Sequence, residues 1–127
     1  MAEDRTLYQI ALSVNNLAKA VDFYRDTLGL RLIKEFSVGA HLAFFDLGGP
    51  RLMIEESANS NPGLFYLFVE NLDESVQQLK TKGVNLEQDP MTIFQDQEGL
   101  FGPAGQSEVL TFIQDPSGNM IGLMSRK

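Results

Sequence analysis

Residues 10–29 read IALSVNNLAKAVDFYRDTLG, and a loose second copy, FYLFVENLDESVQQLKTKG, follows at residues 65–83. The two copies keep an offset of 55 residues, so that Val14 and Asn16 recur as Val69 and Asn71. A repeat of this length corresponds to one supersecondary module rather than to a short solenoid repeat. We therefore expect the chain to contain the same folding unit twice.

Each copy predicts a strand, a tight turn and a helix. Apolar side chains alternate with polar or small ones over residues 10–14, which is the pattern of a strand with two different faces. Asn16 and Asn71 then stand where a helix N-cap belongs, and Gly29 and Gly83 stand where each helix must end in a left-handed residue. The predicted apolar stripes of the two helices are Leu17, Ala20, Val21, Tyr24 and Leu28, and Leu72, Val76 and Leu79.

Three further strands are predicted after each helix, which makes the order βαβββ twice. The predicted strands cover residues 30–37, 40–47 and 51–56 in the first module, and 84–87, 109–114 and 120–125 in the second. Residues 115–119 form a strong turn signal between the last two strands, and residues 57–63 form a polar linker. Residues 92–106 contain GLFGPAG and are predicted as a lid, with Leu100 and Phe101 as apolar flaps, or as a disordered loop.

Composition narrows the class of protein. The chain has 127 residues, of which 43% are hydrophobic, so it is long enough for one domain with a core. A net charge of −7 without a basic run argues against a nucleic-acid partner. The absence of cysteine excludes disulfides and thiolate chemistry, and no leader or membrane-length segment is visible. We expect a cytoplasmic protein that has no membrane partner.

The first module and the late run IQDPSGNMIGL together carry a family resemblance. The pattern V-x-x-L-x-x-A-x-x-F-Y-x-x-x-L-G at residues 14–29 resembles the vicinal oxygen chelate superfamily, which includes glyoxalase I, bleomycin resistance proteins and extradiol dioxygenases. The resemblance implies an α+β fold in which two βαβββ modules form one cleft from curled mixed sheets, with helices on the outer face. It covers nearly all of a single domain, residues 1–127, with modules at about 5–57 and 63–127. The scaffold hosts several chemistries, so the match is less specific for activity.

The resemblance also implies where such a fold holds a metal ion. The four matching positions in this chain are Gln9, Met53, Leu64 and Gly122. Divalent ions require carboxylate, imidazole or amide donors, so three of these four positions cannot serve. Even if a shift of two residues brings Glu55 into the place of Met53, only two plausible donors result. We therefore predict no metal cofactor.

Without a metal, the inward-facing side chains become the informative set. They are apolar, aromatic and rich in methionine, which suits an apolar or planar ligand. The predicted ligand-binding residues are Gln9, Ser13, Met53, Glu55, Leu64, Tyr66, Phe68, Phe101, Met120 and Met124. The alternative is that these apolar side chains only fill a core, and for the set the two interpretations weigh about evenly.

Glu55 and His41 are the weak catalytic candidates. A carboxylate at Glu55 inside an apolar cleft could act as a base or bind a cation, whereas a solvated charge at a strand end is the plainer interpretation. His41, the sole histidine, could act as a general base if its ring faces the cleft. An ordinary strand or surface histidine is again the plainer interpretation.

Two functions from different classes follow. The first is a metal-independent protein of the bleomycin-resistance type that holds an apolar, aromatic or cationic small molecule, as a homodimer according to the resemblance. The second is a divalent-metal enzyme using Zn, Ni, Mn or Fe, a lyase, isomerase or oxygenase acting through Gln9, Glu55 and His41. The second requires donors that Leu64 and Gly122 do not offer, unless a partner chain supplies them.

Overall fold

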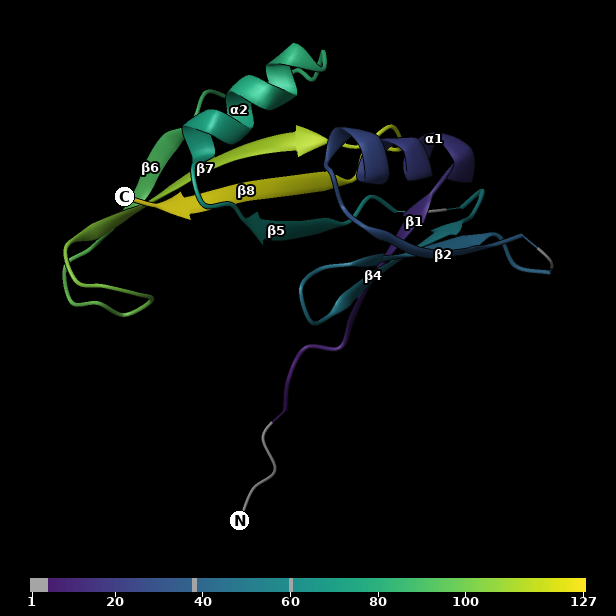
Figure 1. Ribbon diagram of the computed structural model, residues 1–127, viewed down its shortest axis with the longest axis horizontal. Helices are drawn as coiled ribbons and strands as arrows, with labels where there is room; N and C mark the ends of the chain where they lie inside the picture. Colours follow the sequence, from purple (N-terminus) through teal and green to yellow (C-terminus); the bar gives the residue numbers. More distant parts are fainter. Residues whose placement is uncertain (1–4, 38, 60) are drawn as a thin grey trace. The chain divides into compact units, whose positions relative to one another are not determined.

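A computed structural model describes residues 5–37, 39–59 and 61–127, and contains the βαβββ order twice (Figure 1). The first set comprises β1 (Gln9–Val14), α1 (Leu17–Asp22) with a π-helical turn η1 (Phe23–Thr27), β2 (Leu32–Phe36), β3 (Leu42–Asp46) and β4 (Arg51–Glu56). The second set comprises β5 (Leu64–Phe68), α2 (Leu72–Thr81), β6 (Met91–Asp96), β7 (Gln106–Gln114) and β8 (Met120–Arg126). The duplicated module is confirmed.

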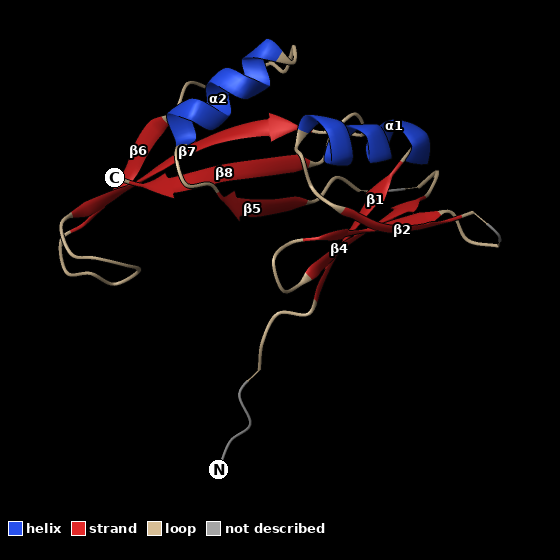
Figure 2. Ribbon diagram, viewed as in Figure 1, coloured by secondary structure: helices blue, strands red, loops and turns tan. Residues whose placement is uncertain are grey.

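The strands form two four-stranded sheets with the same internal order (Figure 2). The orders are β1-β4-β3-β2 and β5-β8-β7-β6. In each sheet the first pair is parallel and the other pairs are antiparallel. Both sheets also carry a register shift in the strand after the helix, between Leu32 and Lys34 in β2 and between Thr92 and Phe94 in β6. The α+β class with two mixed sheets is confirmed.

The chain divides into two compact units that do not follow the sequence continuously. The first unit ends at Gly63 but also includes Asp115–Asn119, the turn between β7 and β8. The second unit comprises Leu64–Gln114 and Met120–Lys127. Residue 60 of the predicted linker lies outside the described residues.

In the first unit, α1 packs on β3 and β4 through the predicted apolar stripe. Leu17, Ala20 and Val21 are buried, and Tyr24 in the π-helical turn is fully buried. The Asn16 side chain accepts a hydrogen bond from the Lys19 backbone N–H at 3.0 Å, so the predicted N-cap is confirmed.

In the second unit, α2 covers one face of its sheet, as Figure 2 shows. Leu72, Val76 and Leu79 are buried as predicted, and Asn71 accepts from the Glu74 backbone N–H at 3.1 Å. Gly83 ends the helix with φ at 84°, and Gly29 does the same in the first unit with φ at 76°. Helix stripes and caps were therefore readable from local sequence.

One predicted strand was wrong. Residues 84–87 form no strand, and β6 occupies Met91–Asp96, of which residues 92–96 lie in the segment that we predicted as a lid or loop. Glu87 still donates its backbone N–H to the Phe112 carbonyl at 2.9 Å, but Pro90 has no N–H with which to extend a ladder. The loop before β7 is correspondingly shorter, at residues 97–105.

The helices are too short for a bilayer. None of the helices in the described part of the chain is long and apolar enough to cross a membrane.

Candidate functional site

The second sheet exposes an aromatic face on the side opposite α2, which we call the open face. Strand register places Tyr66, Gly122 and Phe112 in one row across β5, β8 and β7. Phe68, Met124 and Leu110 form the next row on the same face. Tyr66 is 50% exposed and Phe68 is 64% exposed, so these rings are not core filling within the described chain. The alternation of β5 and β8 therefore presents large apolar side chains outward.

A hollow of about 400 Å³ lies on this unit. Its lining comprises Tyr66, Leu67, Phe68, Phe101, Glu108, Met124, Ser125 and Arg126. Four of the predicted ligand-binding residues thus meet around one space, namely Tyr66, Phe68, Phe101 and Met124. Rings and a thioether are suited to a flat apolar ligand, and the volume is within the range of small-molecule sites.

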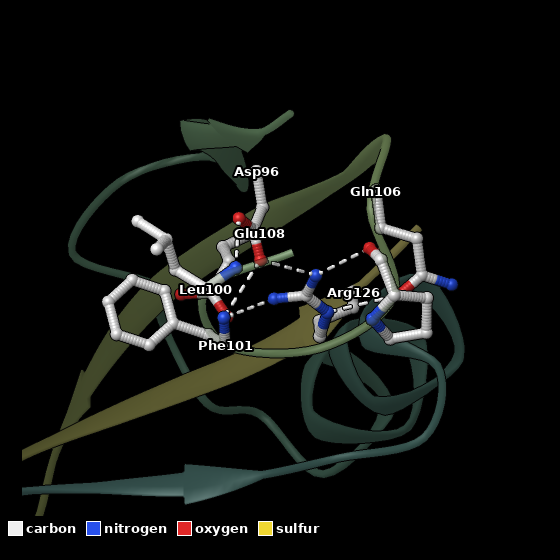
Figure 3. A network of polar contacts seen from close by, with 7 residues as sticks. Asp96, Leu100, Phe101, Gln106, Glu108 and Arg126 are labelled. Carbon is white, nitrogen blue, oxygen red and sulfur yellow. Dashed lines mark hydrogen bonds and ion pairs between the residues drawn. The ribbon is translucent and has the colours of Figure 1, made fainter. Parts of the chain in front are cut away.

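Glu108 and Arg126 of the lining belong to a network of polar contacts, which Figure 3 shows. The Arg126 guanidinium donates to the carboxylates of Asp96 and Glu108, each at 2.9 Å. It also donates to the Gln106 amide oxygen and to the Pro103 carbonyl, each at 3.0 Å. Five N–H groups in one plane allow arginine to serve this many acceptors at once. Arg126 therefore joins β6, β7, β8 and the loop before β7.

Asp96 anchors that loop from the other side of the ion pair. Its fully buried carboxylate accepts the backbone N–H groups of Leu100 at 2.7 Å and Phe101 at 3.0 Å. These hydrogen bonds, that of Phe101 first, and the charge of Arg126 lower the pKa of Asp96 to about 2. Phe101 also meets Phe94 edge to face at 5.8 Å. These contacts hold the loop beside the hollow, and Phe101, one of the two predicted apolar flaps, lines it.

The residues at the family's metal positions do not fit a metal ion. A Cβ at Gly122 would lie 2.7 Å from Cε2 of Tyr66, closer still to its Cδ2, and 3.2 Å from Phe112. The Tyr66 ring thus occupies the space into which a side chain at 122 would project. Leu64 offers no donor, and the Gln9 amide oxygen accepts the Arg51 Nε–H at 2.6 Å. No group of three or more His, Cys, Asp or Glu side chains with metal-site geometry occurs among the described residues.

The other predicted site residues lie elsewhere in the fold. Gln9, Ser13, Met53 and Glu55 belong to the first sheet, where strand register places Ser13 opposite Glu55. Leu64 pairs with Met120 in register, and neither residue lines the hollow. The hollow of the second unit is therefore built without these six residues.

The two weak catalytic candidates do not form a pair. Glu55 is exposed near the end of β4. His41 is exposed and precedes β3, where its backbone carbonyl accepts from the Glu56 N–H at 2.9 Å. No hydrogen bond joins the His41 and Glu55 side chains within the described set of contacts. Among the described residues, neither side chain has a hydrogen-bonded partner of the kind that orients a general base.

Sequence reasoning missed the charged side of the hollow. Glu108 and Arg126 were not singled out, because single charges near strand ends usually face solvent. The available signal was alternation: Glu108 shares a strand face with Leu110 and Phe112, and Arg126 shares one with Met124. Only the pairing of Glu108 with Arg126 in register shows that the two charges are neighbours.

Comparison with known proteins gives consistent results. The model of the Glyoxalase/Bleomycin resistance protein/Dioxygenase superfamily matches residues 6–123. Metallothiol transferase FosB of Staphylococcus epidermidis is 44% identical over 50 residues, which are 39% of this chain and 34% of that protein. Its counterpart in Staphylococcus haemolyticus (strain JCSC1435) is 42% identical over 50 residues, again 39% and 34% of the two chains. The match therefore spans about a third of the length of these curated relatives.

Solved structures share the fold at low sequence identity. A glyoxalase family protein from Bacillus anthracis is 19% identical, with a TM-score of 0.79 over 100% of this chain and 99% of that chain. Lactoylglutathione lyase from Agrobacterium tumefaciens is 20% identical, with a TM-score of 0.73 over 98% of this chain and 96% of that chain. At these identities the likeness concerns the fold alone.

Proposed function

Because this chain belongs to the glyoxalase/bleomycin resistance protein/dioxygenase superfamily, we propose that it is a metal-independent member that binds a planar aromatic small molecule on the open face of its second sheet. The observation that carries the proposal is the Tyr66 ring above Gly122. A family position for a metal ligand holds a residue without a side chain, and an aromatic ring fills the space above it. The same ring forms the floor on which a flat ligand would stack.

The charge around the hollow favours a ligand that carries a positive charge. The charged residues that line the hollow are Glu108 and Arg126, and the buried Asp96 lies behind them in contact with Arg126. The three side chains together carry one net negative charge. Aromatic faces such as those of Tyr66 and Phe68 attract cations, and the chain as a whole has a net charge of −7. We therefore infer that a planar aromatic cation binds more tightly than a neutral ring system of the same size.

The names of the curated relatives favour a second function, metal-dependent transfer chemistry. Among the four family positions only Gln9 offers a donor that hard or borderline ions prefer, and Arg51 already donates to its oxygen. Elemental analysis and a thermal-shift series with Zn²⁺, Ni²⁺, Mn²⁺ and Fe²⁺ separate the two functions. Stoichiometric metal together with a raised Tm would establish the second function and overturn the metal-independent one.

A homodimer, inferred from the family resemblance, and a cytoplasmic location, expected from the composition, complete the proposal. In a two-fold dimer each subunit contributes the same surface to the interface. Native mass spectrometry measures the stoichiometry directly. A monomer across the micromolar range would remove the dimer from the proposal and leave the binding function in place.

Ligand binding is tested with a fluorescent acridinium cation, because the chain contains no tryptophan to interfere with the signal. We expect saturable binding with one dye for each chain, and about tenfold weaker binding to Phe68→Ala, since one stacked ring contributes on the order of 1 kcal/mol beyond its buried area. Leu7→Ala, which removes an equally exposed apolar side chain outside the second unit, is the matched control and should bind normally. Equal affinity of all three proteins would overturn the assignment to the open face.

A further inference from the structure

Arg51 is a half-buried arginine of β4, on the face of the first sheet opposite the buried Leu52 and Ile54. Its guanidinium carbon lies 4.6 Å from the centre of the Tyr8 ring and 5.2 Å from that of Phe44. Contact with two rings holds the planar group in place and leaves its N–H groups, which point outward in the plane, to find acceptors.

Those N–H groups are only partly used. Nε–H donates to the Gln9 amide oxygen at 2.6 Å, and Nη1 reaches the Tyr8 hydroxyl at 3.4 Å, which is a long contact. No hydrogen bond from Nη2 to an acceptor is found among the described residues. The outer edge of the guanidinium, formed by Nη1 and Nη2, is therefore available to a ligand.

Arg51 also has no carboxylate partner in the described part of the chain, in contrast to Arg25, Arg31 and Arg126. Asp46 stands opposite Arg51 in the register of β3 and β4. Its carboxylate instead accepts from the Gly48 backbone N–H at 2.9 Å and from Arg31 at 3.4 Å. Asp46, the acidic neighbour of Arg51 in register, thus bonds to other groups.

A second cation lies on the same face. Lys34 of β2 stands opposite Phe44 in register, and its ammonium group lies 5.8 Å from the centre of the Phe36 ring. No ion pair of Lys34 is found among the described residues. Within the described residues, Lys34 and Arg51 are thus two cations without carboxylate partners, Lys34 next to Phe44 in register and Arg51 against its ring, in a chain whose net charge is −7.

We propose that Arg51, with Gln9, Tyr8, Phe44 and Lys34, forms a binding site for a small oxyanion, a carboxylate or a phosphoryl group. The free edge of the guanidinium matches two oxygens of such a group, and the rings preorganise it. Gln9 occupies a family metal position, yet its oxygen receives a guanidinium. The positively charged guanidinium therefore donates a hydrogen bond to the oxygen that a metal ion would otherwise bind. All five residues belong to the first unit, whereas the residues of the proposed aromatic site belong to the second.

The test is an NMR titration of the arginine side-chain N–H signals with benzoate and, separately, with inorganic phosphate, at constant ionic strength set with sodium chloride. We expect saturable shifts of the Arg51 signals, with at least one of the two anions binding in the millimolar range. Tighter binding of benzoate assigns the site to carboxylates, and tighter binding of phosphate assigns it to phosphoryl groups. Linear shifts without saturation for both anions would overturn the proposal.

Variants separate this site from general charge effects. Arg51→Gln should weaken anion binding at least tenfold, as measured from the chemical shifts of the backbone amides of β4. Arg25→Gln removes one positive charge at an exposed ion pair and should leave anion binding unchanged. Arg51→Lys keeps the charge but loses the paired N–H groups, and should bind more weakly than the native protein. Equal binding by Arg51→Gln and Arg25→Gln would also overturn the proposal. A thermal melt of each variant confirms that it is folded.

The two proposed sites share no residue, so each proposal can be tested without the other. Phe68→Ala should bind the oxyanion normally, and Arg51→Gln should bind the acridinium cation normally. Loss of both ligands in either variant would overturn the separation of the two sites.

Discussion

The Asp115 carboxylate accepts four hydrogen bonds in the first unit. One oxygen receives the backbone N–H groups of Ser117 and Asn119, each at 2.8 Å. The other receives the Tyr24 hydroxyl at 2.7 Å and the Asn119 side-chain amide at 2.9 Å. Burial first, and then the charge of Asp115, raise the pKa of Tyr24. The turn at residues 115–119 is thus a structural element of this chain, and the hydrogen bonds of the almost fully buried Asp115 carboxylate hold it in place.

Replacing Tyr24 with phenylalanine should destabilise the protein. The change removes a hydrogen bond to a buried charged acceptor, which is worth about 1.5–3 kcal/mol in the free energy of unfolding. Tyr66→Phe is the matched control, because the half-exposed Tyr66 hydroxyl has no hydrogen bond to a described residue, and its stability should match the native protein. Urea denaturation measures both variants. Equal loss in the two would show that the hydroxyl of Tyr24 contributes nothing specific.

Asp96 gives the protein a defined sensitivity to acid. Its pKa is near 2 in the folded state against 3.8 in an unfolded chain, so its contribution to stability is complete above about pH 4 and is lost as the pH falls towards 2. The free energy of unfolding should therefore fall less steeply between pH 4 and 2 in Asp96→Asn than in the native protein. Asp73→Asn, at an exposed ion pair, should keep the native slope. Urea denaturation at pH 4, 3 and 2 provides the slopes, and identical slopes for all three proteins would refute the assignment.

At the scale of elements, the loop at residues 97–105 depends on one close approach. A Cβ at Gly102 would lie 2.6 Å from Nε and 2.7 Å from Cζ of Arg126, so the guanidinium occupies the space beside the glycine. The backbone at Gly102 is not in the left-handed region, so the position needs glycine for the space beside Arg126 and not for its conformation. Packing against Arg126 thus accounts for Gly102 within the GLFGPAG segment.

Gly102→Ala should displace Arg126 and release the loop. Hydrogen exchange at the Leu100 and Phe101 amides, both bonded to Asp96, should become at least about tenfold faster, since charged hydrogen bonds of roughly 1.5–3 kcal/mol are weakened. Glu98→Ala changes an exposed side chain of the same loop and should not alter the exchange. If Gly102→Ala exchanged at the native rate, the loop would be held by other contacts.

Strand β6 shows why one element escaped prediction. Every residue of β6 except Asp96 is exposed, and Met91, Ile93 and Phe94 are all large exposed apolar residues. A periodic pattern arises only when one face of a strand is buried, and this edge strand has none. The other strands except β2 have a buried face, as both helices do, and local patterns located them. β2 is also an exposed edge strand, in which only Leu32 is half-buried, and its apolar residues still placed it within the predicted residues 30–37.

For the whole molecule, the path of the chain couples the two units. The chain leaves the second unit after Gln114, enters the first unit for residues 115–119, and returns to the second at Met120. Within the first unit, the buried Asn119 side chain donates to the Ser13 carbonyl at 2.9 Å and accepts from the Gly63 N–H at 2.6 Å. Neither unit is a continuous segment that could be excised without cutting the other.

We expect the two units to unfold together. In urea, backbone amides of β4 and β8 should report one common midpoint in the native protein, as in other small domains. Asn119→Ala should lower that midpoint equally for both strands, because it leaves the half-buried Gly63 amide without its acceptor, at a cost of about 1–3 kcal/mol. Asn59→Ala, at an exposed position, is the control. Two separate midpoints in the native protein would contradict the coupling.

The sequence alone determined the repeat, the family, the helix caps and nearly all strands, because each of these depends on residues within a few positions along the chain. It also placed residues without metal donors at three of the four family positions. Only the tertiary structure decided which distant side chains meet at two of these positions and beside the hollow. The Tyr66 ring over Gly122, Arg126 on Asp96 and Arg51 on Gln9 join residues 56, 30 and 42 positions apart. Strand register brings such partners together, and no local pattern encodes which side chain fills the space that another has left.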